Sequence, residues 1–314
     1  MIASESPPHG PSSLLAYAQL VRVPNLSTAV ADVAMGFLFV RAVTGGGDTV
    51  LLVVLAAGSM AMYAAGTVLN DLFDIEIDAR ERPARPIPSG RVSPAAARRL
   101  GMGLLAVGLM LGLVASLVTA TVWPLVVAAA LAACVILYDG LLKRTPAGPV
   151  VMGGCRMLNV LWGMSVAGAP PAAGWAVAGG IGIYVAGVTL LARQEAGRSH
   201  RGLLLAGTAV LLAGIALLAS LPTWTDRLAT VAREEPWRWW VLPAVVALVV
   251  GKRCLAAVAD PAPHRVQAAV KQGILSLVVL DAAVVLAVRG PVPALGVLAL
   301  LLPAVLLARR VPMT

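Results

Sequence analysis

The sequence predicts an all-α membrane protein, a polytopic bundle of nine to ten transmembrane helices, from three observations. Its 314 residues are 59% hydrophobic and only 12% charged, whereas soluble domains carry about a quarter charged residues. The mean hydropathy is +0.88. Apolar runs long enough to cross a bilayer recur along the chain, and Lys and Arg gather in alternate connections between them. Because Lys and Arg gather in alternate connections, membrane orientation explains the net charge of +9. We therefore expect no nucleic-acid partner.

Ten apolar runs are the candidate spans, and residues that stop a span separate most of them. The connections include TGGGD at 44–48, the arginines from Arg80 to Arg99, YDGLLKRTPAGP at 138–149, GAPPAAG at 168–174 and ADPAPHR at 259–265. The runs cover 25–43, 49–70, 98–120, 122–139, 148–168, 174–192, 202–222, 237–257, 267–288 and 291–308. Only RGP at 289–291 separates the last two. They could therefore form one re-entrant hairpin, and nine spans is the main alternative.

The domain organisation and orientation follow from these spans. We expect residues 1–24 to form an N-terminal tail with an interfacial segment, and residues 25–310 to form a single transmembrane domain. If the N-terminus is cytoplasmic, nearly every basic cluster falls on the cytoplasmic side. That arrangement predicts a multi-pass protein of a bacterial-type cell (plasma) membrane.

Acidic residues crowd the point where the second span ends. Five of the chain's 15 acids stand within eleven residues there: Asp71, Asp74, Glu76, Asp78 and Glu81. On a helix, Asp71, Asp74 and Asp78 share one face, with Asn70 beside them. Three converging carboxylates repel one another unless a cation neutralises them, and Mg²⁺ binds through carboxylates together with substrate phosphates. We therefore predict that Asn70, Asp71, Asp74 and Asp78 hold Mg²⁺.

Basic residues follow the acids in the same loop and in the next one on that side. Arg85 and Arg91 stand among prolines that restrict the loop, and guanidinium groups are suited to binding phosphate. We predict that they bind a diphosphate, together with Lys143 and Arg144 of the next loop. Tyr138 lies at the membrane boundary beside these two residues.

Arg156 and Asn159 lie three residues apart in the next apolar run. A buried arginine needs an anion or an acid as its partner, so we place both residues in the diphosphate site. Asn159 fits an ordinary contact between helices equally well. Asp32 and Asp281 also lie within predicted spans, where each needs a buried partner.

These motifs resemble those of a known family. NDxxDxxxD at 70–78 followed by RPIPSGR at 85–91 resembles the first aspartate motif and loop of the UbiA-type intramembrane prenyltransferases. YxxxLKR at 138–144 resembles the second loop of that family. The combination with CRMLNVLWG at 155–163 is most similar to its EboC-like branch.

The resemblance implies a helical bundle around a central cavity and Mg²⁺-dependent transfer of a prenyl group from its diphosphate to a small, possibly aromatic, acceptor. Asn70, Asp71, Asp74 and Asp78 would hold the metal and diphosphate, and Arg85 and Lys143 would neutralise charge on the leaving group. Tyr138 would present its ring or hydroxyl to the reacting carbon. The implied catalytic set is therefore Asp71, Asp74, Asp78, Tyr138 and Lys143.

The chain departs from the family's second aspartate motif, DxxxD, at the end of the sixth span. That region contains one acid, Glu195, and several arginines, including Arg193. Arg193 could replace one metal by neutralising phosphate, with Glu195 as a remaining metal ligand. Alternatively, the protein binds an isoprenoid lipid or serves a transport pathway without catalysis. The acceptor, the prenyl chain length and the oligomeric state stay open.

Overall fold

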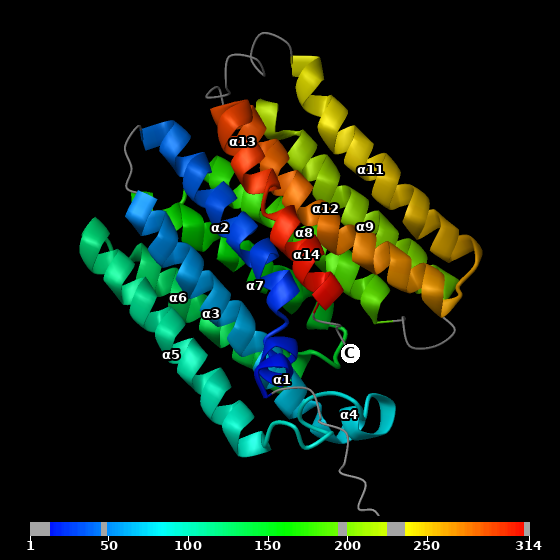
Figure 1. The fold of residues 1–314 in the computed structure, drawn as a ribbon. Coiled ribbons are helices and arrows are strands. Elements are labelled where there is room, and N and C mark those ends of the chain that lie inside the picture. Colours follow the sequence, from blue (N-terminus) through cyan, green and yellow to red (C-terminus); the bar gives the residue numbers. More distant parts are fainter. Residues whose placement is uncertain (1–12, 45–48, 194–199, 225–235, 311–314) are drawn as a thin grey trace, which may run out of the picture.

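The computed structural model describes residues 13–44, 49–193, 200–224 and 236–310, and in these ranges the chain forms helices and no strands (Figure 1). Nine helices are long and apolar enough to cross a membrane within these ranges. Their elements are α2 (Val23–Thr44), α3 (Thr49–Phe73), α5 (Pro94–Thr119), α6 (Trp123–Leu137) continued by η1 (Tyr138–Leu142), α7 (Gly148–Met164) continued by η2 (Ser165–Ala167), α8 (Ala172–Ala192), α9 (Arg201–Ala219), α11 (Pro236–Ala259) and α12 (Pro263–Arg289). The predicted fold class is confirmed.

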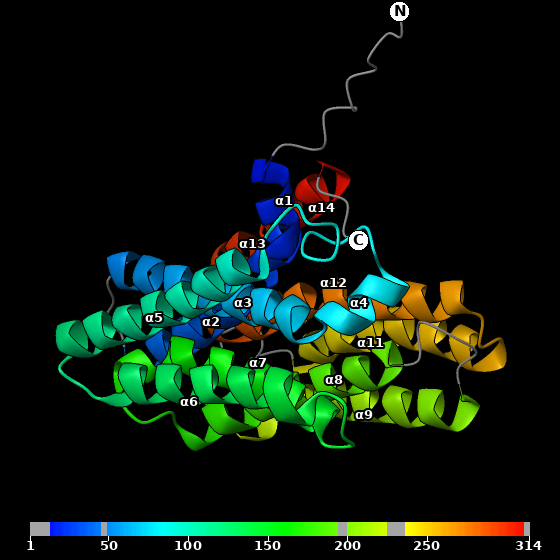
Figure 2. The same cartoon turned by 90° about the horizontal axis from the view of Figure 1, so that it is seen from below.

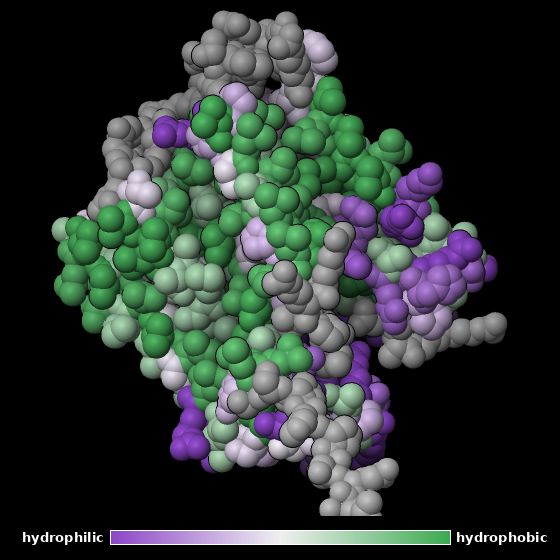
Figure 3. Space-filling view, in the orientation of Figure 1, coloured by the Kyte–Doolittle hydropathy of each residue, from purple (hydrophilic) through white to green (hydrophobic). Residues whose placement is uncertain are grey.

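Shorter elements complete the described chain. α1 (Ser13–Leu20) precedes the bundle, α4 (Ile75–Glu81) follows α3, and η3 (Leu221–Thr223) follows α9. α1, α4 and the loop 82–93 lie at one end of the bundle, which we call the motif end (Figure 1). Figure 2 shows the same elements beside α14 from a second direction. Figure 3 shows apolar side chains over the middle of one face and hydrophilic ones toward the motif end, as expected for a body embedded in lipid.

The tenth predicted span is divided into two short helices. α13 (Pro291–Leu298) and α14 (Leu301–Arg310) are separated by a break at residues 299–300. Pro303 lies in the first turn of α14, three residues after this break. Proline is tolerated in the first turn of a helix but disrupts a helix interior, which agrees with a new helix that starts at Leu301. The two pieces follow one another back to the motif end (Figure 1). Of the two predicted counts, nine agrees with the number of long spanning helices in the described ranges.

Close packing between α2 and α7 determines what lies in the middle of the bundle. A Cβ atom at Gly36 would lie 2.2 Å from the carbonyl oxygen of Val160, and one at Gly163 would lie 2.2 Å from that of Val33. Only glycine permits this approach, as in many membrane helix pairs. The contact places Asp32 of α2 against Arg156 and Asn159 of α7.

Candidate active site

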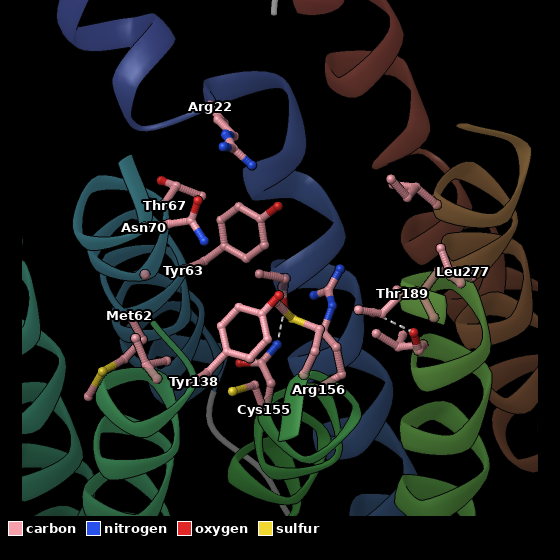
Figure 4. A pocket seen from close by; sticks show the side chains of 18 of the residues that line it. Arg22, Met62, Tyr63, Thr67, Asn70, Tyr138, Cys155, Arg156, Thr189 and Leu277 are labelled. Carbon is pink, nitrogen blue, oxygen red and sulfur yellow. Dashed lines mark hydrogen bonds between the residues drawn. The ribbon is translucent and has the colours of Figure 1, made fainter. Parts of the chain in front are cut away.

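A cavity of about 320 Å³ extends into the bundle from the motif end, between α2, α3, α6, α7, α8 and α12. Arg22, Asn70, Tyr138 and Asp139 line it where these helices reach the motif end. Farther along α3 and α7 it is lined by Ser59, Tyr63, Arg156 and Asn159. Figure 4 shows the labelled side chains of Tyr63, Tyr138 and Arg156 directed toward the same space. The structure therefore contains the central cavity that the resemblance implied.

The helix that carries the first aspartates is interrupted at Asp74, between the end of α3 at Phe73 and the start of α4 at Ile75. Asp71 and Asp78 meet the same arginine, whereas Asp74 meets Lys143 and Arg144. Asp71 and Asp78 are buried, and both accept hydrogen bonds from Nη1 of Arg85, at 3.1 and 2.6 Å. Arg22 donates to the same Oδ1 of Asp71 at 3.0 Å. Two acids and two guanidinium groups thus form one buried ionic cluster.

Asp74 turns to the loop after the fourth span. Its two carboxylate oxygens accept hydrogen bonds from Nζ of Lys143 and, at 3.0 Å, from Nη2 of Arg144. Burial raises the pKa of Asp74, but the hydrogen bonds and charges of Lys143 and Arg144 outweigh burial and hold that pKa below its ordinary value. Asp74 is therefore ionised at neutral pH, and it joins two sequence motifs that lie 69 residues apart.

A π-helical turn, η1, positions the cavity side of that loop. It runs from Tyr138 to Leu142, and such turns add a residue to a helix and often occur at functional sites. Asn70 donates from Nδ2 to Oδ1 of Asp139 at 2.9 Å. Asp139 and Arg22 are cavity residues absent from the predicted site. Asp139 carried a usable signal, an acid at the end of an apolar run, whereas the sequence around Arg22 indicated only membrane orientation.

Arg91 and Arg193, both predicted to bind diphosphate, make hydrogen bonds to loops and α1. Arg91 donates to Oε1 of Gln19 at 2.7 Å and to the carbonyl oxygen of Ala84 at 2.6 Å. Arg193 donates from Nη2 to the carbonyl oxygens of Lys143, at 2.7 Å, and Thr145. Neither side chain lines the cavity. Glu195, the predicted extra metal ligand, lies outside the described residues.

Arg156 and Asn159 lie deeper in the cavity wall. Nη1 of Arg156 donates to Oδ2 of Asp32 at 2.7 Å, and its Nη2 donates to Oγ1 of Thr28 at 2.7 Å. Asn159 donates to the same Asp32 oxygen at 3.1 Å and accepts a 2.7 Å bond from Ser59. The buried arginine thus has the acidic partner that membrane burial requires.

The residues of the motif end fit Mg²⁺ in donor chemistry. Asn70, Asp71, Asp74 and Asp139 offer the hard oxygen atoms that this ion prefers. Each of these acids already accepts from an arginine, a lysine or Asn70, and no cluster of three or more potential metal-ligating acids, histidines or cysteines is found among the described residues. These oxygen atoms therefore suit a metal ion that binds together with phosphate groups. The phosphates would replace the carboxylates as hydrogen-bond partners of the arginines and lysines.

Comparison with known proteins decides the family. The model of the UbiA prenyltransferase family matches residues 30–265. The chain belongs to the UbiA prenyltransferase family. The matched region contains the cavity residues from Ser59 to Ala192, and the predicted family is confirmed.

Similar proteins include synthases from archaea. The chain is 38% identical over 161 residues to a digeranylgeranylglyceryl phosphate synthase of Methanopyrus kandleri, covering 51% of this chain and 56% of the relative. It is 34% identical over 152 residues to the synthase of that name from Saccharolobus solfataricus, covering 48% and 51%. The chain thus spans about half the length of these curated relatives.

Solved structures share the fold. A UbiA homolog of Aeropyrum pernix K1 has a TM-score of 0.62 at 19% identity, covering 82% of this chain and 97% of that one. A homolog of Archaeoglobus fulgidus bound to GPP and Mg²⁺ has a TM-score of 0.59 at 13% identity, covering 82% and 98%. At these identities the likeness establishes the architecture of a multi-pass membrane protein of this family.

Proposed function

We propose that this protein is a Mg²⁺-dependent membrane prenyltransferase that moves an isoprenyl group from its diphosphate to a small acceptor. One observation carries the proposal: next to the cavity residues Arg22, Asn70 and Asp139, hydrogen bonds join acids and cations from three segments. The acids are Asp71, Asp74, Asp78 and Asp139, and the cations are Arg22, Arg85, Lys143 and Arg144. Family membership and the GPP- and Mg²⁺-bound homolog support the assignment.

The residues present suit each half of such a reaction. The diphosphate displaces the carboxylates of Asp71 and Asp74 as partners of Arg85 and Lys143, and these cations stabilise the negative charge that develops on the leaving group. Bound at Asn70, Asp71, Asp74 and Asp139, Mg²⁺ would supply further charge neutralisation of the phosphates. When the allylic C–O bond breaks, its electron pair leaves with the diphosphate.

The cavity then protects the allylic cation. Its lining is mainly apolar and contains the rings of Tyr63 and Tyr138, whose faces stabilise positive charge. Apolar walls exclude water, so the acceptor forms the new bond to carbon and then loses its proton. Tyr138, beside Asp139 and at the mouth, is the aromatic residue that we assign to this role.

The acceptor and the membrane orientation belong to the same proposal. The name of the archaeal relatives supports a glycerophosphate-type acceptor as one class, beside the small aromatic class that the sequence suggested. We place the motif end at the cytoplasmic face of a bacterial-type cell membrane because the basic residues gather there. Membership of the EboC-like branch stays a prediction.

Binding of geranyl diphosphate to the purified protein tests the proposal. We expect binding that requires Mg²⁺, and Asp74→Asn should weaken it by about 100-fold because the variant loses a charged ligand and its contacts to two cations. Release of diphosphate with the two acceptor classes then measures turnover. Tight, Mg²⁺-dependent binding without release would favour the alternative, an isoprenoid-lipid binding or transport component. Binding indifferent to both Mg²⁺ and Asp74 would refute the diphosphate site.

A further inference from the structure

A second polar cluster lies behind the cavity wall, at membrane depth. Its centre is Asp32, which is fully buried and accepts from Arg156 and Asn159 through Oδ2. Asp281 of α12 is also fully buried and contacts the Asp32 carboxyl. Oδ1 of Asp32 and both oxygens of Asp281 have no donor among the described residues.

Charge balance explains this arrangement. Two touching carboxylates away from water cannot both be ionised at acceptable cost beside a single guanidinium. Arg156 already faces the Asp32 carboxylate at 2.7 Å, so a second anion placed against Arg156 would meet that carboxylate behind it.

Arg156 nevertheless retains donors for a ligand. Its hydrogen bonds within the described chain use two of its five N–H groups. Its side chain is 11% exposed, it lines the cavity, and its guanidinium lies 5.5 Å from the ring centre of Tyr63. Figure 4 shows Arg156 between Tyr63 and Tyr138 on one side and Thr189 and Leu277 on the other.

The walls of the cavity differ in polarity. The α3–α7 wall carries Ser59, Tyr63, Arg156 and Asn159. The α8–α12 wall carries Val185, Val188, Val270, Ile274 and Leu277. It also carries Tyr184 and Thr189, whose hydroxyl groups donate to backbone carbonyl oxygens. A hydrocarbon chain against the first wall would leave donors of Arg156 without an acceptor, which is unfavourable for a buried polar group. The apolar wall suits the prenyl chain, whereas the polar wall suits a ligand that can form hydrogen bonds.

We propose that Arg156 binds an uncharged oxygen of the acceptor, a hydroxyl or carbonyl group, and thereby holds the acceptor on the α3–α7 wall. This assignment rests on the proposed function and replaces the predicted role of Arg156 in diphosphate binding. Seven residues of α3 separate Tyr63, which covers Arg156, from Asn70 at the mouth, a rise of about 10 Å. That separation leaves room for the diphosphate at the mouth and the acceptor farther in. Asp32, Asp281 and Asn159 act as positioning residues for Arg156.

Two uncharged probes of similar shape test the assignment. Hydroquinone carries two hydroxyl groups where p-xylene carries two methyl groups. Their apparent Kd values come from the rise of the denaturation temperature with probe concentration. We expect the wild type to bind hydroquinone about ten-fold more tightly than p-xylene, the usual size of a charge-assisted hydrogen bond. The double variant Arg156→Gln/Asp32→Asn removes both charges together, and it should lose this preference.

Geranyl diphosphate with Mg²⁺ provides the second measurement. Its affinity should change by less than about two-fold in the double variant, since Arg156 lies away from the mouth. Arg98→Gln, an arginine exposed on α5, is the matched control and should behave as the wild type. If the double variant does not fold, Arg156→Lys keeps the pairing with Asp32 and should reduce the preference for hydroquinone through loss of the planar fork.

Several results would overturn the assignment. One is a wild type that does not prefer hydroquinone, and another is a variant that keeps the preference. A ten-fold loss of geranyl diphosphate affinity in the double variant would return Arg156 to the diphosphate site. The probe measurement uses no prenyl diphosphate, so its outcome stays separate from a failure of the proposed function, which would appear as absent Mg²⁺-dependent binding of geranyl diphosphate.

Discussion

The two rims of the cavity mouth are built from opposite kinds of residues. On one side, next to the cavity-lining Asn70, the segment where α3 meets α4 carries Asp71, Asp74 and Asp78, each held by arginine or lysine. The rim formed by α8 carries Thr189 and Ala192, and no acid occurs in α8 from Ala172 to Ala192. The Thr189 hydroxyl group donates a hydrogen bond to the carbonyl oxygen of Val185, at 2.8 Å.

On the proposed function, this asymmetry indicates which helices supply the charged groups that bind the diphosphate and its metal ion. Where the family pattern DxxxD is expected, at the end of the sixth span, this chain has Arg193 and the single acid Glu195. Arg193 donates to carbonyl oxygens of the 143–145 loop and so supports Lys143 from outside the cavity. On the proposed function, α8 acts by positioning the cationic loop, while α3 and α4 supply the carboxylates.

The largest effect is expected at Asp71, a buried acid that pairs with two arginines. Asp71→Asn leaves the side chain's shape but removes the charge shared by Arg22 and Arg85. Breaking a buried ion pair costs about 3–5 kcal/mol, so we expect a clear fall in the thermal denaturation midpoint and at least a 100-fold loss of geranyl diphosphate affinity. Denaturation scans and binding titrations at low temperature measure the two effects.

A matched control separates burial from charge. Asp260 pairs with Arg265 at 3.0 Å, but both side chains are about half exposed, at 53% and 45%. Asp260→Asn should change stability by less than about 1 kcal/mol and leave the binding of geranyl diphosphate unaltered. Equal effects at Asp71 and Asp260 would contradict the buried cluster.

An intermediate effect is expected from giving α8 an acid. Thr189→Asp places a carboxylate on the cavity wall. Because a further hard oxygen favours Mg²⁺, the Mg²⁺ concentration that half-saturates geranyl diphosphate binding should fall by about three- to ten-fold. Thr189→Asn has a similar size without the charge and should leave that concentration unchanged. If Thr189→Asp weakened diphosphate binding at every Mg²⁺ concentration, the α8 rim would not face the metal.

Much of the fold could be predicted because it depends on local properties of the chain. Apolar length identified nine of the spanning helices, and Pro303 explains why the tenth run is broken into α13 and α14. The segments beside the mouth could also be predicted, since clustered acids at the end of an apolar run are not explained by the basic residues that set membrane orientation.

Pairing within the site could not be predicted, because it depends on contacts between distant segments. The sequence suggested that acids hold a metal while arginines hold phosphate, whereas the structure pairs Asp74 with Lys143 and Asp71 with Arg22. The helix is interrupted at Asp74, and this side chain pairs with Lys143 and Arg144 of the next loop, 69 and 70 residues away. The contact between Asp32 and Arg156 requires the close approach of α2 and α7, which no local pattern specifies.

The smallest effect is expected at Arg91, which tests how far the anion site extends along its loop. Arg85 is buried within the ionic cluster, whereas Arg91 donates to Gln19 of α1, to Ser89 and to the carbonyl oxygen of Ala84. Arg91→Ala removes hydrogen bonds that are worth about 1 kcal/mol each when formed with a charged group at a partly exposed position. The denaturation midpoint should therefore fall slightly, while geranyl diphosphate affinity stays within about two-fold of the wild type. A ten-fold loss of affinity would mean that Arg91 leaves α1 when the diphosphate binds, as its position in the RPIPSGR motif had suggested, and that α1 is released from the loop in the same step.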